Sequence, residues 1–283
     1  MFRNHYHYFI AGLPDFFMDD AEIGFPMHDF KNMLKEELRP EDFKLVQLLF
    51  LAYDNKTLLN YLNEDYQNHH QLSTFGNDVY DIEFSDEKKG ILPEYMYRFV
   101  EIYKNEELNQ NINRSWENVI TEMYYDFVLK TNNKFLNDWF EFNRNVNNII
   151  IGYNCRKHNI TAENQLIGDN MVTQAILKSN AKDFGLSVEL PYITEVIAQA
   201  EKDNFIAREK GLDQLRWEKL EELTLFNYFT IEVILAYTIK LDIAYRWLEL
   251  EEETGREMFR QIIDDLKSSF EFPKEFALNG KNK

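Results

Sequence analysis

The sequence predicts a predominantly all-α protein, arranged as a multi-lobed helical bundle. Glycine and proline are scarce, with 10 and 6 among 283 residues, and scarce breakers favour long helices over a fold with many turns. Apolar residues recur at spacings of three and four over much of the chain. Hydrophobic residues make up 45% of the chain and aromatic residues 15%, which is enough to bury a core.

The first predicted unit, residues 1–90, is an N-terminal helical lobe with an extended arm and a long loop. Residues 5–13 (HYHYFIAGL) alternate and are rich in β-formers before Pro14, which predicts a short strand or an extended arm. Residues 67–90 are polar and irregular. They predict a long loop, with a small hairpin as one option, and a lobe boundary at that loop.

Three helices are predicted between the arm and the loop. Helical periodicity begins near Met27, and Pro40 suits the first turn of the second helix because that position needs no backbone donor. Asp54 and Asn55 are turn-forming residues. We therefore expect the second helix to end there and a short helix (TLLNYL) to follow.

The second predicted unit, residues 91–283, contains the main helical lobe or lobes. Helical patterns follow one another after Pro93. Breaks are expected where polar residues or breakers interrupt them, at 105–114, 131–133, 168–169, Gly185 and Pro191. The stretch 213–253 has neither glycine nor proline and is predicted to be one very long helix of about 60 Å, at about 1.5 Å per residue.

The stretch from 134 to 160 combines an apolar stripe with seven asparagines. The stripe residues step by four and three and are expected to pack inward: Phe135, Trp139, Phe142, Val146, Ile149 and Tyr153. Arg144, Asn147 and Asn148 share a second face. Buried amides must find hydrogen-bond partners, so this face is predicted to join an internal polar network.

The long helix carries a similar mixed stripe, in which one side collects apolar residues and two charges: Leu225, Tyr228, Glu232, Leu235, Ile239, Ile243, Arg246 and Leu250. The two charges lie about 21 Å apart along the axis and cannot pair. A buried Glu232 needs a cation, and Arg144 is our candidate; the alternative is a partly exposed Glu232 at the rim. The predicted structural network comprises Arg144, Asn147, Asn148, Glu232 and Arg246.

The formal net charge is −18, from 49 acidic and 31 basic residues. This charge opposes binding to nucleic acid, whose phosphates require clustered lysine and arginine, and to anionic membrane surfaces. It suits either a basic protein partner or solubility alone. Cys155 is the single cysteine, so an internal disulfide is excluded. With no signal peptide and no apolar run long enough for a span, we expect a soluble, cytoplasmic protein.

Catalytic motifs are missing from the sequence. It contains no G-x-S-x-G, P-loop or G-x-G-x-x-G pattern, and no histidine follows a glutamate at the spacing of a di-iron helix bundle. The pairs His5/His7 and His69/His70 lack further ligands, and nothing identifies a base for Cys155. We therefore expect no catalytic residues, no metal and no cofactor.

Three stretches resemble an uncharacterised bacterial family encoded beside the genes of V/A-type ATPases: NHYHYFIAGLPDFFMDD, FLNDWFEFNRNVNNIIIGYNCRKHNI and LRWEKLEELTLFNYFTIEVILAYTIKLDIAYRWLELEEETG. The resemblance covers about residues 6–255. Its most specific part is the last stretch, in which these residues recur with fixed spacing: Trp217, Glu232, Lys240, Arg246 and Trp247.

A more distant resemblance is to the C subunit of V-type ATPases, called d in eukaryotes, an all-helical protein between the central stalk and the membrane ring. Residues 145–149 resemble its Asp-x-x-Asn-Ile pattern, with Asn145 in place of the aspartate and Arg156 two residues from the expected arginine. The resemblance implies a non-catalytic, C-subunit-like component of a proton- or sodium-translocating V/A-type ATPase. Such a component would bind central-stalk subunits and the ring, peripheral to the inner face of the cell membrane through those partners alone.

Two other functions are compatible with the residues. One is an unrelated helical adaptor that holds another protein through its loop 67–90 or its acidic helices. The other is a helical enzyme with a polar pocket around Arg144, Asn148 and Glu232. Internally satisfied polar groups in the two helices would favour the structural role over the enzyme.

Overall fold

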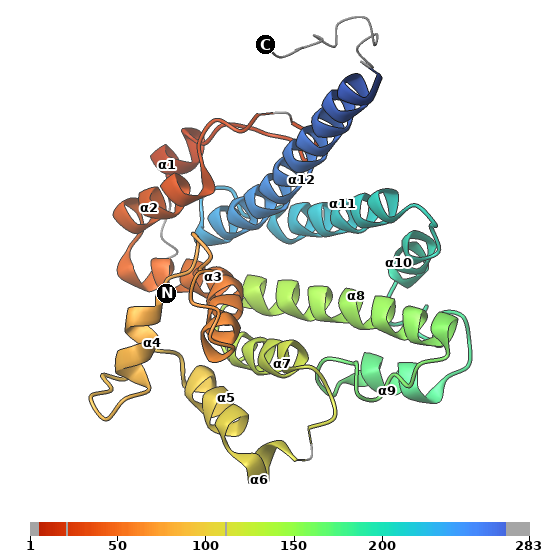
Figure 1. The fold of residues 1–283 in the computed structure, drawn as a ribbon, viewed down its shortest axis with the longest axis horizontal. Helices are drawn as coiled ribbons and strands as arrows, with labels where there is room; N and C mark the ends of the chain where they lie inside the picture. The colour runs from red at the N-terminus through yellow and green to blue at the C-terminus, as the bar shows by residue number, and fades with distance from the viewer. Residues whose placement is uncertain (1–5, 21, 111, 270–283) are drawn as a thin grey trace, which may run out of the picture.

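The computed structural model describes residues 6–20, 22–110 and 112–269, and of 251–269 the helix alone. These residues form twelve α-helices and no strand, so the all-α prediction is confirmed. In Figure 1 the helices α3, α7 and α8 form the centre of the bundle, α10 and α11 lie above α8, and α12 runs out of the bundle. Residues 1–5 and 270–283 lie outside the described part.

The N-terminal segment is helical, so the predicted strand or extended arm is wrong over the residues described. Helix α1 spans His7–Ala11, with backbone hydrogen bonds such as that from Ile10 N–H to Tyr6 O at 2.9 Å. The Tyr6 N–H donates to Phe229 O at 2.6 Å, and the His7 ring lies 4.3 Å from that of Phe229. The aromatic alternation therefore serves packing against a distant turn, not sheet pairing.

Helices α2 (Met27–Glu37) and α3 (Pro40–Leu62) follow, and Pro40 occupies the first turn of α3 as predicted. Helix α3 continues through Asp54 and Asn55, so the turn predicted there is wrong. Asp54 and Asn55 do not end the helix, because their side chains are engaged by other parts of the chain.

Asp54 and Asn55 bond to residues far along the chain. Asp54 Oδ1 accepts hydrogen bonds from the Thr74 N–H at 2.6 Å, the Phe75 N–H at 2.9 Å and the Ser73 hydroxyl at 3.0 Å. Asn55 Oδ1 accepts from the Tyr95 hydroxyl at 2.6 Å. Because Asp54 Oδ1 and Asn55 Oδ1 are engaged by tertiary partners, they do not compete with the helical backbone, although Asp54 Oδ2 is buried without a partner among the described residues.

The predicted loop 67–90 contains a helix, α4 (Asn77–Glu83), in the place where a hairpin was considered. Three helices follow, α5 (Glu94–Lys104), the single turn α6 (Glu106–Asn109) and α7 (Trp116–Val128). The break predicted at 105–114 therefore holds one helical turn. Ser115 accepts a hydrogen bond from the Asn118 N–H at 3.2 Å and so caps α7.

Helix α8 (Lys134–His158) crosses the middle of the bundle and ends at Asn159 in the left-handed conformation, with φ of 55°. The inward packing of its apolar stripe is confirmed by five buried members: Phe135, Trp139, Phe142, Val146 and Ile149. Helices α9 (Met171–Lys178) and α10 (Ile193–Ala200) pack against α8.

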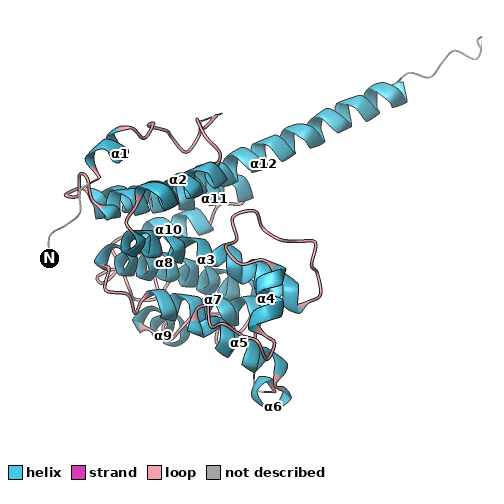
Figure 2. Cartoon of the chain, turned by 90° about the vertical axis from the view of Figure 1, so that its left-hand side faces the viewer, coloured by secondary structure: helices cyan, strands magenta, loops and turns pink. Residues whose placement is uncertain are grey.

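The predicted helix 213–253 is two helices, α11 (Phe205–Thr224) and α12 (Ile231–Ser269), so the prediction of one unbroken helix is wrong. Residues 225–230 break it without glycine or proline. The Thr224 hydroxyl bonds back to Leu220 O at 2.8 Å, and the Asn227 amide bonds to Leu223 O at 3.3 Å. The break lets α12 fold back against α11 before it extends beyond the bundle, as Figure 2 shows.

One hydrophobic core joins the two predicted units across residue 90. Tyr124 of α7 donates its hydroxyl to Leu48 O of α3 at 2.7 Å, and Tyr237 of α12 donates to Pro14 O at 2.9 Å. Across the described chain, each helix is either too short or too polar to cross a bilayer.

Candidate functional site

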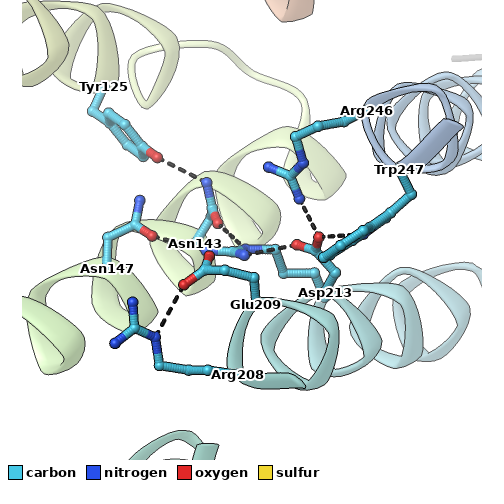
Figure 3. Close-up of polar contacts among 9 residues, drawn as sticks. Tyr125, Asn143, Asn147, Arg208, Glu209, Asp213, Arg246 and Trp247 are labelled. Carbon is cyan, nitrogen blue, oxygen red and sulfur yellow. Dashed lines mark hydrogen bonds and ion pairs between the residues drawn. The ribbon is translucent and has the colours of Figure 1, made fainter. Parts of the chain in front are cut away.

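Asp213 of α11 is the centre of a buried polar network (Figure 3). Its side chain is 0% exposed. Oδ1 accepts from Arg216 Nη1 at 2.8 Å, and Oδ2 accepts from Trp247 Nε1 at 2.9 Å and from Arg246 Nη2. One carboxylate on α11 thus bonds to two side chains of α12, and the charge-assisted bonds replace the water it has lost.

Arg216 extends the network to α8 and α7. Its Nε donates to Asn143 Oδ1 at 2.9 Å and its Nη2 donates to Asn147 Oδ1 at 3.0 Å. The Asn143 amide in turn donates to the Tyr125 hydroxyl at 2.9 Å. Asn143 and Asn147 are four residues apart and therefore share one helix face. We call Asp213, Arg216, Arg246, Trp247, Asn143, Asn147 and Tyr125 the Asp213 network.

A second carboxylate, the partly buried Asp242, lies on α12 beside this network. Its Oδ1 accepts a hydrogen bond from the Tyr53 hydroxyl of α3. Desolvation raises the pKa of Asp242, and the repulsion from Glu249 and Asp213 adds to this rise beyond what Tyr53 and Arg246 offset. Burial and the adjacent Asp242 likewise raise the pKa of Tyr53.

A cavity of about 610 Å³ lies between α3, α7, α8, α11 and α12 and reaches both acidic groups. Its polar lining includes Asp213, Arg216, Asp242 and Arg246, with Lys56 on α3. The rest of the wall is largely apolar and aromatic and includes Phe50, Tyr53, Tyr124, Tyr125, Trp139, Phe140, Ile239 and Ile243. This is the composition of a small-molecule site: an apolar cleft with a few convergent polar groups.

The structure also has a groove of about 540 Å³ between the start of α8 and the α11–α12 turn. Four carboxylates line it: Asp138, Glu141, Glu222 and Glu232. The lysines there are already engaged, because Lys134 pairs with Asp138 and Lys219 bonds to Glu222 at 2.9 Å. The groove is therefore acidic.

Two members of the predicted network, Asn147 and Arg246, belong to the Asp213 network. Asn148 has a different role: its amide donates to Ile167 O at 2.9 Å and its Oδ1 accepts from the Ile167 N–H at 2.8 Å. Because both hydrogen bonds go to the backbone of the same residue, Asn148 holds the loop after α8 against the helix.

The predicted pairing of Arg144 with Glu232 is not formed. Arg144 lies 3.8 Å from Asp126, and its buried Nε has no partner among the described residues. Glu232 accepts from the Thr230 hydroxyl and lines the acidic groove. Of the pocket considered around Arg144, Asn148 and Glu232, Glu232 lines the acidic groove, whereas Arg144 and Asn148 line neither that groove nor the 610 Å³ cavity.

Sequence reasoning missed Asp213, Arg216 and Asn143. A signal was present: Asp213 and Arg216 are three residues apart on a face that includes Leu212 and Leu220, so both charges lie next to apolar residues. Among the described residues, no three histidine, cysteine, aspartate or glutamate side chains gather as a metal site would require. His5 of the pair His5/His7 lies outside the described residues.

Comparisons with curated proteins and with solved structures find no match to this chain. A family model does match it, over residues 3–270, and its description is "Protein of unknown function (DUF2764)". The match includes every residue of the Asp213 network and nearly the whole length of the chain. The chain therefore belongs to the DUF2764 family.

Proposed function

We propose that this protein is a non-catalytic, C-subunit-like component of a V/A-type ATPase that links the central stalk to the membrane ring. The proposal starts from the sequence resemblance of three stretches to a family encoded beside the genes of that enzyme. The structural observation that supports it is the Asp213 network, in which one buried carboxylate ties α11 to α12 and, through Arg216, to α8.

A network of this kind suits a part that transmits force. Arg216 is 13% exposed and engages three side chains, two on α8 and one on α11, through Nε, Nη1 and Nη2. Sliding one helix past another would leave a buried charge unpaired, and such a loss costs about 3–5 kcal/mol. The bundle therefore resists shear between α8, α11 and α12, as a coupling between rotor parts requires.

The acidic surface supports a charged contact with the partner. The chain has a net charge of −18, and the groove beside the α11–α12 turn contributes four carboxylates to that surface. Basic segments of the ring or of the stalk foot would complement it, and contacts between exposed charges weaken as salt screens them.

The test is affinity purification of the tagged full-length protein from the organism that encodes it, after mild detergent treatment of its membranes. We expect central-stalk and ring components to be recovered at low ionic strength. At about 1 M salt, where the screening length falls to about 3 Å, recovery should drop. Mass spectrometry of the bound fraction measures the recovery at low and at high ionic strength.

An unrelated bait protein of similar net charge, carrying the same tag, is the control for capture by charge alone. Recovery of ATPase components with this protein and not with the control supports the proposal. Recovery of a different, specific set of proteins would show an adaptor for another assembly. A bound fraction without ATPase components at any ionic strength contradicts the proposal.

A further inference from the structure

The carboxylate of Asp242 faces the central cavity with one oxygen unused. Its Oδ1 accepts from the Tyr53 hydroxyl, and among the described residues no hydrogen bond to Oδ2 is formed, so Oδ2 remains accessible to solvent or to a ligand. Carboxylates taken out of water are nearly always paired or hydrogen-bonded. A partly buried acid with a free oxygen that lines a 610 Å³ cavity is therefore a group for which the fold itself supplies no full partner.

The cations around the cavity do not supply that partner. Arg216 has Nε, Nη1 and Nη2 engaged by Asn143, Asp213 and Asn147. Arg246 donates to Asp213 and its side chain is 53% exposed; its charge lowers the pKa of Asp242, but among the described residues it forms no hydrogen bond with that carboxylate.

The rim of the cavity is electrically balanced. Lys56 and Glu117 both line it and both are exposed, so their opposite charges are largely screened by solvent. Among the described residues of the lining, Asp242 is therefore the partly buried acid without an ion pair, whereas Asp213 pairs with Arg216 and Arg246.

Aromatic rings form much of the surrounding wall. Tyr53 and Phe50 come from α3, Tyr124 from α7, and Trp139 and Phe140 from α8. Aromatic faces attract cations, more strongly when both are desolvated, and they also bury apolar groups. The cavity volume lies within the range of small-molecule sites, about 300–1,000 Å³.

We propose that this cavity binds a small organic cation, with an ammonium group at Asp242 Oδ2 and an apolar body against the aromatic wall. The site is separate from the coupling role proposed above and does not depend on it. Carboxylate plus aromatic faces is the combination that recognises an alkylammonium group, because it supplies both a hydrogen-bond acceptor and a low-dielectric, electron-rich surface.

The electrostatics of Asp242 agree with this occupant. Its pKa is raised by desolvation, with Glu249 and Asp213 adding to the rise, so the protein alone disfavours the ionised form. A bound ammonium group would favour the carboxylate and lower that pKa. Binding should therefore release protons at pH values between the pKa of Asp242 in the complex and its pKa in the protein alone.

The probe is 2-phenylethylammonium, and its comparators are 2-phenylethanol, which replaces the ammonium by a hydroxyl, and 3-phenylpropionate, which carries the opposite charge. Isothermal titration calorimetry of the full chain measures binding, and the intrinsic tryptophan fluorescence, to which Trp139 in the cavity wall contributes, provides a second readout. We expect saturable binding of the ammonium compound, and binding at least about tenfold weaker for both comparators.

Asp242→Asn is the decisive variant, because the amide oxygen can still accept from Tyr53 while the charge is removed. We expect it to weaken binding of 2-phenylethylammonium by at least about tenfold, with a Tm equal to or above that of the wild type. The control is Glu189→Gln, which removes an exposed charge outside the cavity lining and should leave binding unchanged.

Three results would overturn the proposal: no saturable binding of the ammonium probe, equal binding by Asp242→Asn, or preference for 3-phenylpropionate, which would assign the cavity to anions held by Arg246 and Lys56. If Asp242→Asn does not fold, the three probes measured on the wild type decide by themselves. Preference for the cation then supports the site, and equal or reversed preference removes it.

Discussion

At the residue scale, Asp213 shows how much of the architecture depends on a few atoms. Its two carboxylate oxygens join Arg216 on its own helix to Arg246 and Trp247 on α12. Arg216 relays the connection to Asn143 and Asn147. A buried ionic group of this kind is costly to assemble and costly to break, because removing one partner leaves the others buried and unpaired.

Asp213→Asn should therefore destabilise the protein by about 3–5 kcal/mol, because Arg216 keeps its charge in a nearly buried position without a counter-ion. Urea unfolding followed by circular dichroism measures the change. Glu218→Gln is the control on the same helix: Glu218 is exposed and accepts from Gln214 at 2.9 Å, and the amide retains an acceptor. We expect its effect to stay within about 0.5 kcal/mol. Equal effects of the two variants would refute the assigned role of Asp213.

At the element scale, Gly152 sets how closely α8 approaches the segment that follows it. A Cβ atom at this position would lie 2.7 Å from Ile176 Cγ2 and 3.2 Å from Phe184 Cζ. The Ile176 contact is with the branch methyl, next to the backbone of α9, so it cannot turn away easily. Glycine is a poor helix former, but at position 152 it allows α8 to pack closely against α9.

Gly152→Ala should destabilise the protein by about 1 kcal/mol. Alanine gains about 1 kcal/mol of helix propensity over glycine, and overpacking costs about 1–3 kcal/mol. Thermal unfolding compares this variant with Gly24→Ala, whose added Cβ meets nothing within 4 Å. A Gly152→Ala variant more stable than the wild type would show that the α8–α9 contact can relax.

The connection from α4 to α5 depends on the side chain of Glu83. Its carboxylate accepts backbone N–H bonds from Gly90 at 2.9 Å, Lys89 at 3.0 Å and Ile91 at 3.3 Å, and the Tyr97 hydroxyl also donates to it. Burial works to raise the pKa of Glu83, but these hydrogen bonds prevail and lower it below its ordinary value of 4.5.

This depressed pKa predicts a pH dependence. The stabilisation from ionised Glu83 is fully present above the unfolded-state pKa of 4.5 and is lost as pH falls through the lower folded-state value. Glu83→Gln should therefore be less stable than the wild type near neutral pH, and the difference should narrow below about pH 4. Urea midpoints across this pH range measure it. A difference that stays constant with pH would exclude ionisation of Glu83 as the cause.

At the scale of the whole molecule, the core runs without interruption from α2 and α3 into α7, α8 and α12. Polar contacts cross the same boundary, including those of Tyr53 with Asp242 and of Tyr124 with Leu48 O. These contacts predict that the regions before and after residue 90 unfold together.

Unfolding should accordingly show a single transition. All four tryptophans, Trp116, Trp139, Trp217 and Trp247, lie after residue 90, so their fluorescence reports on the second region, whereas far-UV circular dichroism reports on every helix. We expect the two midpoints in urea to coincide. A dichroism transition without a fluorescence counterpart would instead identify residues 1–90 as an independent unit.

The helical class and the inward faces could be predicted from the sequence, because they follow from local rules. Each of these features depends on residues within one or two helical turns of one another: the scarcity of glycine and proline, Pro40 at a first turn, the polar joints between helices, and the stripe from Phe135 to Ile149. Periodicity also identified the region of α8 that carries buried asparagines.

Only the tertiary structure decided where polar side chains find partners. Asp54 and Asn55 predicted a turn, but distant groups bond to their Oδ1 atoms and α3 continues. Residues 225–230 predicted helix, but packing of α12 on α11 requires a reversal there. The polar network was likewise predicted around Arg144 and Glu232, whereas in the structure Asp213 is at its centre. Local sequence determined which residues face inward, whereas pairing among buried charges depends on distances between helices that the three-dimensional packing alone sets.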